Sequence, residues 1–332
     1  MTDQLALFDA SPLDEPDPAA VQLARTHEAA AAIAARVPAG VCFGTSSWSF
    51  TGWKGLVFSG TRTQTQLARE GLREYARHPL LTTVGVDRSY YAPMAADDLH
   101  AWSEQLPEGF RCCFKAPASV TALALGPPSR TSANKDFLSV ERLVDDLLRP
   151  CDAVFREHTG PIILEFPPFP RAMRVDPVDF LARLDRFLAQ LPRSFEYAVE
   201  LRDARLLTPV YRDVLLRHRV AHTFNYWSAM PAPGLQAKIV PPDEADFAVV
   251  RLLLRPGTRY EDQRERFAPF SHLVEPDEVM RADVVSIARR VVNRGRRVFV
   301  LVNNKAEGSS PLTVMALAAR LAAEGAAHAT EP

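Results

Sequence analysis

Three basic and three acidic side chains stand at or near the ends of apolar, strand-like runs of the chain. The basic residues are Lys115, Arg202 and Arg251, and the acidic residues are Asp87, Glu165 and Glu200. If these strand ends converge, an unpaired charge among them would be strongly disfavoured, so we expect Lys115 to pair with Glu200 or Glu165. Such a pair could do general acid–base chemistry, because burial and the partner both move pKa values. Lys115, Glu200 and Glu165 are therefore the candidate catalytic residues, and the alternative is an ion-pair network that only orients loops.

Aromatic and amide side chains lie at the same strand ends. Six aromatic residues, Trp48, Trp53, Tyr90, Tyr91, Tyr226 and Trp227, would suit stacking on a ring such as a sugar or a base. Asn303 and Asn304 precede Gly308 and a helix start near Pro311, where a phosphate could bind at the helix N-terminus. The candidate substrate-binding residues are Trp48, Trp53, Asp87, Tyr91, Arg202, Tyr226, Asn303 and Asn304.

Eight apolar runs alternate with helix-period segments and must position these residues. The expected strands are 41–46, 80–86, 110–115, 161–166, 195–200, 220–225, 247–254 and 297–302. The expected helices are 64–78, 96–105, 134–149, 176–190, 205–218, 277–294 and 312–324. Because parallel strands need crossovers, eight βα units predict an α/β fold of the TIM (β/α)8 barrel type. A doubly wound open sheet is the alternative, and the absence of GxGxxG and GxxxxGK[ST] motifs disfavours it.

Composition narrows the class of protein. A hydrophobic fraction of 47% and a net charge of −1 indicate an ordinary globular protein with no overall attraction to nucleic acid or membrane. The first 18 residues carry five acids and no Lys or Arg, so they lack the basic region of a secretory signal, and we expect a cytoplasmic protein. The four cysteines, at 42, 112, 113 and 151, have no metal-ligand spacing, and we expect them to be reduced packing residues.

Other kinds of site find less support in the sequence. No HExxH, HxH or GxSxG motif is present, which disfavours zinc and serine hydrolases. We expect no cofactor, although Glu165, Glu200 and Asp87 could bind Mg²⁺ or Mn²⁺. Arginine clusters at 251–266 and 289–297 could contact phosphate backbones, but a solvated face is the favoured interpretation, so we do not expect direct nucleic-acid binding.

Six segments in order resemble domain-of-unknown-function family 72, the YecE-like proteins. They are GTSSWSFTGWKGLVF (44–58), VDRSYYAP (86–93), LPEGFRCCFKAP (106–117), ILEFPPF (163–169), YAVELRD (197–203) and FVLVNNKAEGSSPLTVMAL (299–317). The resemblance covers nearly all of residues 41–323 and implies a TIM barrel, in agreement with the strand count. It implies no particular activity.

The chain departs from the pattern of this family at several positions. The glutamate of the family's VExN segment is Gly85 here and its asparagine is Asp87, while Glu165 replaces a glutamine before the double proline. The histidine that follows the FKAP segment in the family is Ala122 here. The losses at 85 and 122 suggest a divergent branch with altered chemistry.

The first forty residues differ from the rest. Residues 1–19 are acidic and proline-rich and predict disorder, and Val21 to Val37 predicts a helix. Gln4, Leu5, Leu7 and Phe8 resemble the QLxLF peptide by which bacterial DNA polymerases and repair proteins dock on the sliding clamp. We therefore expect an extension (1–40), a YecE-like barrel (41–323) and a short tail (324–332).

These observations support three hypotheses about function. The first is an enzyme that acts on a phosphorylated, sugar-like or nucleotide-like small molecule at the barrel mouth. The second is a DNA-maintenance accessory protein recruited to the sliding clamp through residues 4–8. The third is a barrel that only binds its ligand.

Overall fold

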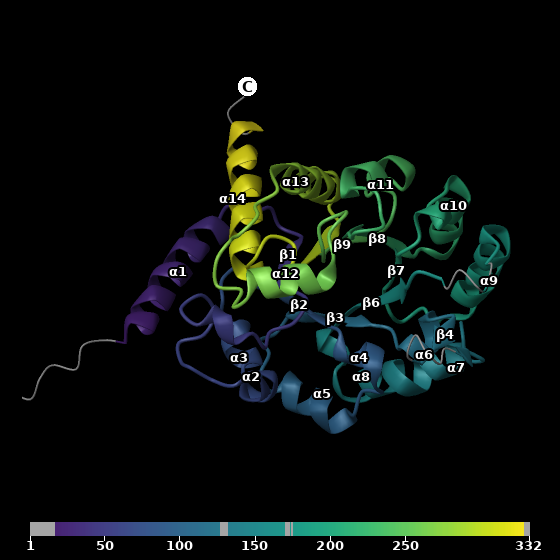
Figure 1. Ribbon diagram of the computed structural model, residues 1–332, viewed down its shortest axis with the longest axis horizontal. Coiled ribbons are helices and arrows are strands. Elements are labelled where there is room, and N and C mark those ends of the chain that lie inside the picture. Colours follow the sequence, from purple (N-terminus) through teal and green to yellow (C-terminus); the bar gives the residue numbers. More distant parts are fainter. Residues whose placement is uncertain (1–16, 127–131, 170–172, 174, 329–332) are drawn as a thin grey trace, which may run out of the picture.

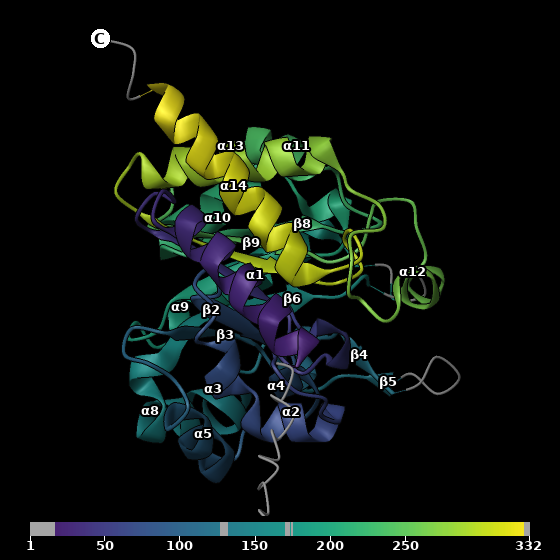
Figure 2. The same ribbon diagram turned by 90° about the vertical axis from the view of Figure 1, so that its left-hand side faces the viewer.

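Eight parallel strands close into a barrel, as Figures 1 and 2 show for the computed structural model. The structure describes residues 17–126, 132–169, 173 and 175–328. The strands are β1 (Val41–Thr45), β2 (Thr83–Val86), β3 (Arg111–Lys115), β6 (Thr159–Phe166), β7 (Tyr197–Leu201), β8 (Ala221–Tyr226), β9 (Phe247–Leu252) and β10 (Arg297–Val302). Their order around the barrel is β1-β10-β9-β8-β7-β6-β3-β2, and β2 pairs with β1 to close it. The predicted TIM barrel and its eight strands are confirmed.

Fourteen α-helices are present in the described part of the chain, most of them around the outside of the barrel (Figure 1). They are α1 (Pro18–Ala34), α2 (Gln64–Glu70), α3 (Leu72–Tyr75), α4 (Arg88–Tyr91), α5 (Ala96–Ser103), α6 (Ala118–Thr121), α7 (Val140–Leu143), α8 (Arg149–Val154), α9 (Pro177–Gln190), α10 (Pro209–His218), α11 (Pro233–Ile239), α12 (Tyr260–Phe267), α13 (Glu278–Val292) and α14 (Ser310–His328). Each predicted helix has a counterpart, but 64–78 divides at Gly71, and 134–149 begins only at Val140. Helices α4, α6 and α12 and the small hairpin of β4 (Ala124–Leu125) and β5 (Ser132–Ala133) were not predicted.

Two apolar layers hold the barrel together. A large cluster fills the space between the strands and the helices. A smaller cluster fills the barrel itself and includes Cys113, Ile163, Val249 and Leu301. Because side chains alternate along a strand, this small cluster identifies the inward positions of each strand. All four cysteines are free, as expected, and Cys42 is the least buried of them.

Helix α1 covers the outside of the barrel next to α14 (Figures 1 and 2). Its N-terminus is capped by the Asp17 carboxylate, which accepts a hydrogen bond from Ala19 N at 3.0 Å. The Thr26 hydroxyl lies 3.2 Å from Gly55 O and fastens the helix to the loop after β1. The expected helix at 21–37 is therefore present but begins and ends three residues earlier. The clamp-like peptide Gln4–Phe8 lies outside the described residues. No described helix is both long and apolar enough to cross a bilayer.

Candidate functional site

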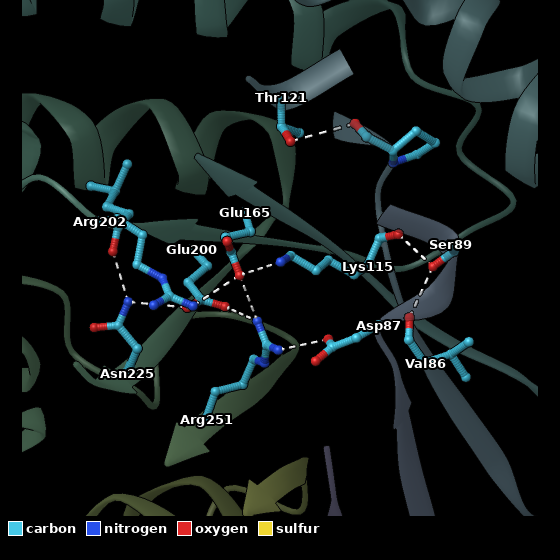
Figure 3. Close-up of polar contacts among 12 residues, drawn as sticks. Val86, Asp87, Ser89, Lys115, Thr121, Glu165, Glu200, Arg202, Asn225 and Arg251 are labelled. Atoms are coloured by element: carbon cyan, nitrogen blue, oxygen red, sulfur yellow. Dashed lines mark hydrogen bonds and ion pairs between the residues drawn. The ribbon is translucent and has the colours of Figure 1, made fainter. Parts of the chain in front are cut away.

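A layer of charged side chains lies at the carboxyl ends of the strands, directly above the apolar filling of the barrel. In β9 the inward positions are Phe247, Val249 and Arg251, and the first two belong to the interior cluster. The same alternation turns charged residues inward at the ends of four other strands, β2, β3, β6 and β7. These residues are Lys115 in β3, Glu165 in β6, Glu200 in β7 and, just beyond their strands, Arg202 and Asp87. Figure 3 shows that they form one connected network.

Glu165 is the residue on which the cations converge. Its Oε2 atom lies 2.9 Å from Lys115 Nζ, 2.8 Å from Arg202 Nη2 and 3.0 Å from Arg251 Nη1. The sequence left open whether Lys115 pairs with Glu200 or with Glu165, and the structure pairs it with Glu165. The Ser89 hydroxyl lies within hydrogen-bond distance of Lys115 O at 2.6 Å, so the start of α4 fixes the end of β3 (Figure 3).

Arg251 connects the three carboxylates of the layer. Its guanidinium contacts Asp87 Oδ1 at 2.9 Å, Glu165 Oε2 at 3.0 Å and Glu200 Oε2 at 2.5 Å. The side chain is only 3% exposed, and these carboxylates raise the pKa of the guanidinium although burial alone would lower it. Arg251 is therefore a permanently charged centre of the network.

Glu200 lies beneath the network rather than at its surface. Its side chain is 0% exposed, and Oε1 lies 2.7 Å from Arg202 Nη2. Asn225 Nδ2 lies 3.4 Å from the same Oε1 atom, and Gln236 Nε2 donates to Asn225 O at 2.6 Å, which fixes this side of the layer. A carboxylate with no exposed surface cannot touch a ligand in this structure. Glu200 contacts Arg202 and Arg251 instead, and a catalytic role for it stays a prediction.

The electrostatics of Glu165 limit what the carboxylates can do. Burial alone would raise the pKa of the Glu165 carboxyl, but Arg202, Lys115 and Arg251 outweigh it and lower the pKa to about 2. Glu165 is therefore ionised near neutral pH and has no proton to donate. A general base works best with a pKa near the working pH, so it is also a weak base. In paired-carboxylate hydrolysis one carboxyl must be protonated, and Glu165 does not fit that role.

The arrangement also answers the question of a divalent metal at Asp87, Glu165 and Glu200. Arg251 contacts all three carboxylates and so takes the central position that a shared cation would need (Figure 3). Within residues 17–126, 132–169, 173 and 175–328, no group of three or more His, Cys, Asp and Glu side chains could hold a metal ion. The residues present therefore do not fit Mg²⁺ or Mn²⁺.

Aromatic rings border the charged layer at two points. Lys115 Nζ lies 3.7 Å from the centre of the Tyr90 ring, and the Arg202 guanidinium lies 4.0 Å from the centre of the Trp227 ring. Tyr91 packs edge to face on Tyr90 at 5.2 Å and is itself 79% exposed. Tyr90, Tyr91 and Trp227 are thus the rings that a ligand above the network could meet.

Three other predicted substrate-binding aromatics lie elsewhere. Trp48 is buried against Trp102, and its Nε1 donates to Leu67 O at 3.1 Å. Trp53 is fully buried. Tyr226 follows the inward Asn225 and therefore points outward, where its hydroxyl donates to Asp277 Oδ2 at 2.6 Å. These placements correct the expectation of an aromatic mouth that includes them.

The two predicted asparagines hold the loop after β10. Asn304 is 1% exposed, and its Oδ1 accepts from Trp53 Nε1 at 3.2 Å and from Ser310 N at 2.8 Å. Asn303 Oδ1 accepts from Lys305 N at 3.1 Å. Asn304 thus caps the start of α14 internally, so its amide oxygen is not available to a ligand. This corrects the expectation that it binds substrate.

Four residues that matter to this site were absent from the predicted catalytic and binding set: Tyr90, Trp227, Lys305 and Arg251. The chain contains 34 Arg and only five Lys. Among the described residues only Lys115 and Lys305 are buried lysines, and both follow or end barrel strands. The scarcity of lysine was the signal in the sequence that could have identified Lys305.

A closed eight-stranded parallel barrel with a polar layer at its carboxyl end defines the class of protein as a TIM barrel. The chain belongs to the DUF72 family, whose sequence profile, described as a protein of unknown function, matches residues 42–332. This confirms the resemblance seen in the sequence.

Solved structures of the same family have a similar fold. A DUF72 family protein from Enterococcus faecalis V583 is 16% identical with a TM-score of 0.58, over 85% of this chain and 95% of that one. A DUF72 family protein from Thermotoga maritima MSB8 is 20% identical with a TM-score of 0.55, over 85% of this chain and 98% of that one. At these identities the likeness extends to the fold alone. No curated protein is similar to the chain.

Proposed function

We propose that the protein is an enzyme that binds a phosphorylated, sugar-like or nucleotide-like small molecule at the mouth of its barrel, with Lys115 as the group that stabilises the transition state. The position of the Lys115 ammonium is the observation that supports this proposal. Its side chain is 10% exposed, and Nζ is held between Glu165 Oε2 and the Tyr90 ring. It is the cation of the layer with the most exposed side chain.

Lysine at this position has a chemical rationale. Arginine outnumbers lysine about sevenfold in this chain, so a buried charge that serves only for pairing would be expected to be arginine, as at 202 and 251. A lysine ammonium is a compact donor that can be aimed at a single oxygen, whereas a guanidinium is a broad, planar fork. Lys115 would donate a hydrogen bond to a substrate oxygen that gains negative charge in the transition state.

The neighbours of Lys115 support that role. Glu165 is ionised throughout the neutral pH range and keeps the ammonium in place. Arg251 contacts Glu165 from below and is itself held by Glu200. Tyr90 and Trp227 offer ring faces beside the polar floor. The carboxylates are positioning residues in this scheme, and Lys115 is the catalytic residue.

The test compares wild-type protein with Lys115→Met and Lys115→Arg variants against a panel of sugar phosphates and nucleotides. Thermal shift and calorimetry measure binding, and NMR follows turnover of each compound that binds. We expect Lys115→Met to remain folded and to lose turnover, and Lys115→Arg to bind but turn over slowly. Lys54→Met is the matched control, because Lys54 is exposed and contacts Thr61. If the wild type binds nothing in the panel, or if Lys115→Met turns over normally, the proposal is wrong.

A further inference from the structure

A groove beside the charged layer lies between three loops at the same end of the barrel. Its volume is about 890 Å³. The loop after β1 contributes Phe50, the segment after β9 contributes Tyr260 of α12 and Phe270, and the loop after β10 contributes Lys305. β9 and β10 are the seventh and eighth strands of the barrel along the chain. In TIM barrels the loops that follow these two strands frequently bind anionic groups.

Lys305 is the buried cation among the described residues that line this groove. It is only 7% exposed, and its Nζ lies 4.4 Å from the centre of the Tyr260 ring. Over the described ranges of the chain, no Asp or Glu oxygen lies within ion-pair distance of Nζ, whereas Lys115 has Glu165 at 2.9 Å. A buried ammonium without an anion is costly. An anionic group in the groove would offset that cost.

The other charges of the groove are exposed on α12. Glu261, Glu265 and Arg264 line its rim, and all three are solvent-exposed. Water and salt screen exposed charges much more strongly than buried ones. The local preference of the groove is therefore set by Lys305, although the two rim acids leave the groove without a net positive charge.

The walls of the groove are closely packed. Gly52 lies so close to the segment 268–270 that a Cβ atom there would stand 1.7 Å from Pro269 O. Phe270 has a φ of 70°, an unfavourable backbone conformation for a bulky residue. Its ring packs edge to face on Phe50 at 5.6 Å. Packing thus fixes two aromatic rings beside the buried ammonium.

We propose that this groove binds a small molecule that carries an anionic substituent on a planar ring, with the anion on Lys305 and the ring against Tyr260, Phe50 or Phe270. The inference rests on the proposed function, because it identifies the part of the mouth that receives the charged end of the ligand. Burial raises the pKa of the Tyr91 phenol, and Asp87, Glu165 and then Tyr260 add to the shift, so Tyr91 lies near both the charged layer and the groove.

The experiment uses the small number of lysines. Full-length protein labelled with ¹³C only at the Cε atom of lysine gives five signals, one for each lysine, which Lys→Arg variants assign. The probes are phenyl phosphate, benzoate, inorganic phosphate and the neutral benzyl alcohol. We expect the Lys305 signal to shift with phenyl phosphate or benzoate. Inorganic phosphate should shift it only at a higher concentration, and benzyl alcohol should not shift it. Phenyl phosphate and benzoate together show whether the anion is a phosphate or a carboxylate.

Variants then locate the two parts of the ligand. Lys305→Met is expected to weaken aryl-anion binding by about tenfold or more, and Lys305→Arg is expected to retain binding. Tyr260→Leu should weaken binding of phenyl phosphate more than that of inorganic phosphate. The titration of the wild-type protein needs no variant to fold.

The outcomes separate this inference from the proposed function. If the Lys115 signal shifts and the Lys305 signal does not, the groove is not the anion site, and the proposed role of Lys115 is unaffected. A shift of Lys305 supports the groove, even if Lys115→Met turns over normally. If the Lys305 signal stays unmoved at saturating probe, or if only a cationic probe such as benzylamine shifts it, the groove does not bind anions.

Discussion

Replacing Arg251 by methionine keeps most of the apolar stem of the side chain and removes its charge. The Arg251 side chain is 3% exposed, and its guanidinium contacts Asp87, Glu165 and Glu200. Removing one partner of a buried ion pair costs about 3–5 kcal/mol, because charge is left uncompensated. Glu165 and Glu200 both retain Arg202, so we expect the lower end of this range, about 3 kcal/mol at pH 7. At about 2.1 cal/mol/K of unfolding entropy per residue, such a loss lowers the Tm of a chain of 332 residues by roughly 4–5 °C.

The loss should also depend on pH in a defined direction. The pKa of Glu165 is about 2 in the folded protein and 4.5 ordinarily, so its ionised form stabilises the fold fully above pH 4.5. This contribution, on the order of 3 kcal/mol, disappears as the pH falls from 4.5 towards 2. Without Arg251 the folded pKa rises and the contribution shrinks. Urea unfolding from pH 7 to pH 3 should therefore show a difference between variant and wild type that is greatest above pH 4.5.

Two variants serve as controls for this experiment. Arg205 forms an ion pair of 2.6 Å with Asp203 at the surface, so Arg205→Met should cause no measurable change. Arg251→Lys keeps the charge, but a single ammonium replaces the planar guanidinium that reaches three carboxylates. The stability of this variant should therefore lie between that of Arg251→Met and that of the wild type. The reasoning is refuted if Arg251→Met is as stable as Arg205→Met, or if its loss of stability is the same at every pH.

Three further predictions concern other parts of the molecule. Gly52→Ala places a Cβ atom 1.7 Å from Pro269 O, so we expect a lower Tm and loss of aryl-anion binding in the groove; an unchanged Tm would contradict the close approach. Burial lowers the pKa of His222 from 6.5 to about 4, so the unfolded chain takes up a proton first and the fold loses stability, on the order of 3 kcal/mol, as the pH falls from 6.5 to 4. His222→Gln should flatten the pH dependence of urea unfolding in that window, and an equally steep profile would argue against a neutral buried histidine. A pull-down with sliding clamp should recover the wild type but not a Leu7→Ala/Phe8→Ala variant, and equal recovery of both would end that hypothesis.

The barrel could be predicted from the sequence because its strands are continuous apolar runs, buried on both faces. Helix α12 could not be predicted in this way. α12 (Tyr260–Phe267) has only Gln263 and Phe267 buried, so its place is determined by contacts distant in the chain rather than by a periodic apolar face. Helix α1 begins three residues before the predicted start. Asp17, which caps it, and Pro18, its first residue, were assigned to the acidic segment instead.

The candidate site was predicted in its residue types but not in its geometry. Strand ends brought Lys115, Glu165 and Arg251 into one set, and the structure joins them. The inward or outward direction of each side chain requires the register of each strand, which the sequence pattern does not specify at strand ends. Tyr226 is the example, since it lies one position beyond an inward residue and so points away from the network.

The pairing of β1 with β10 has a consequence for how the chain is made. Val41 pairs with Val298, so one edge of the first barrel strand stays open until about 250 further residues have been synthesised. At roughly 5–20 residues per second this takes about 10–50 s. An open strand edge is a template for pairing with other chains. Slower translation would lengthen the time for which this edge is open and increase aggregation of nascent chains. Helix α1 also remains without its neighbour α14 for this time, because α14 follows the last barrel strand in the chain.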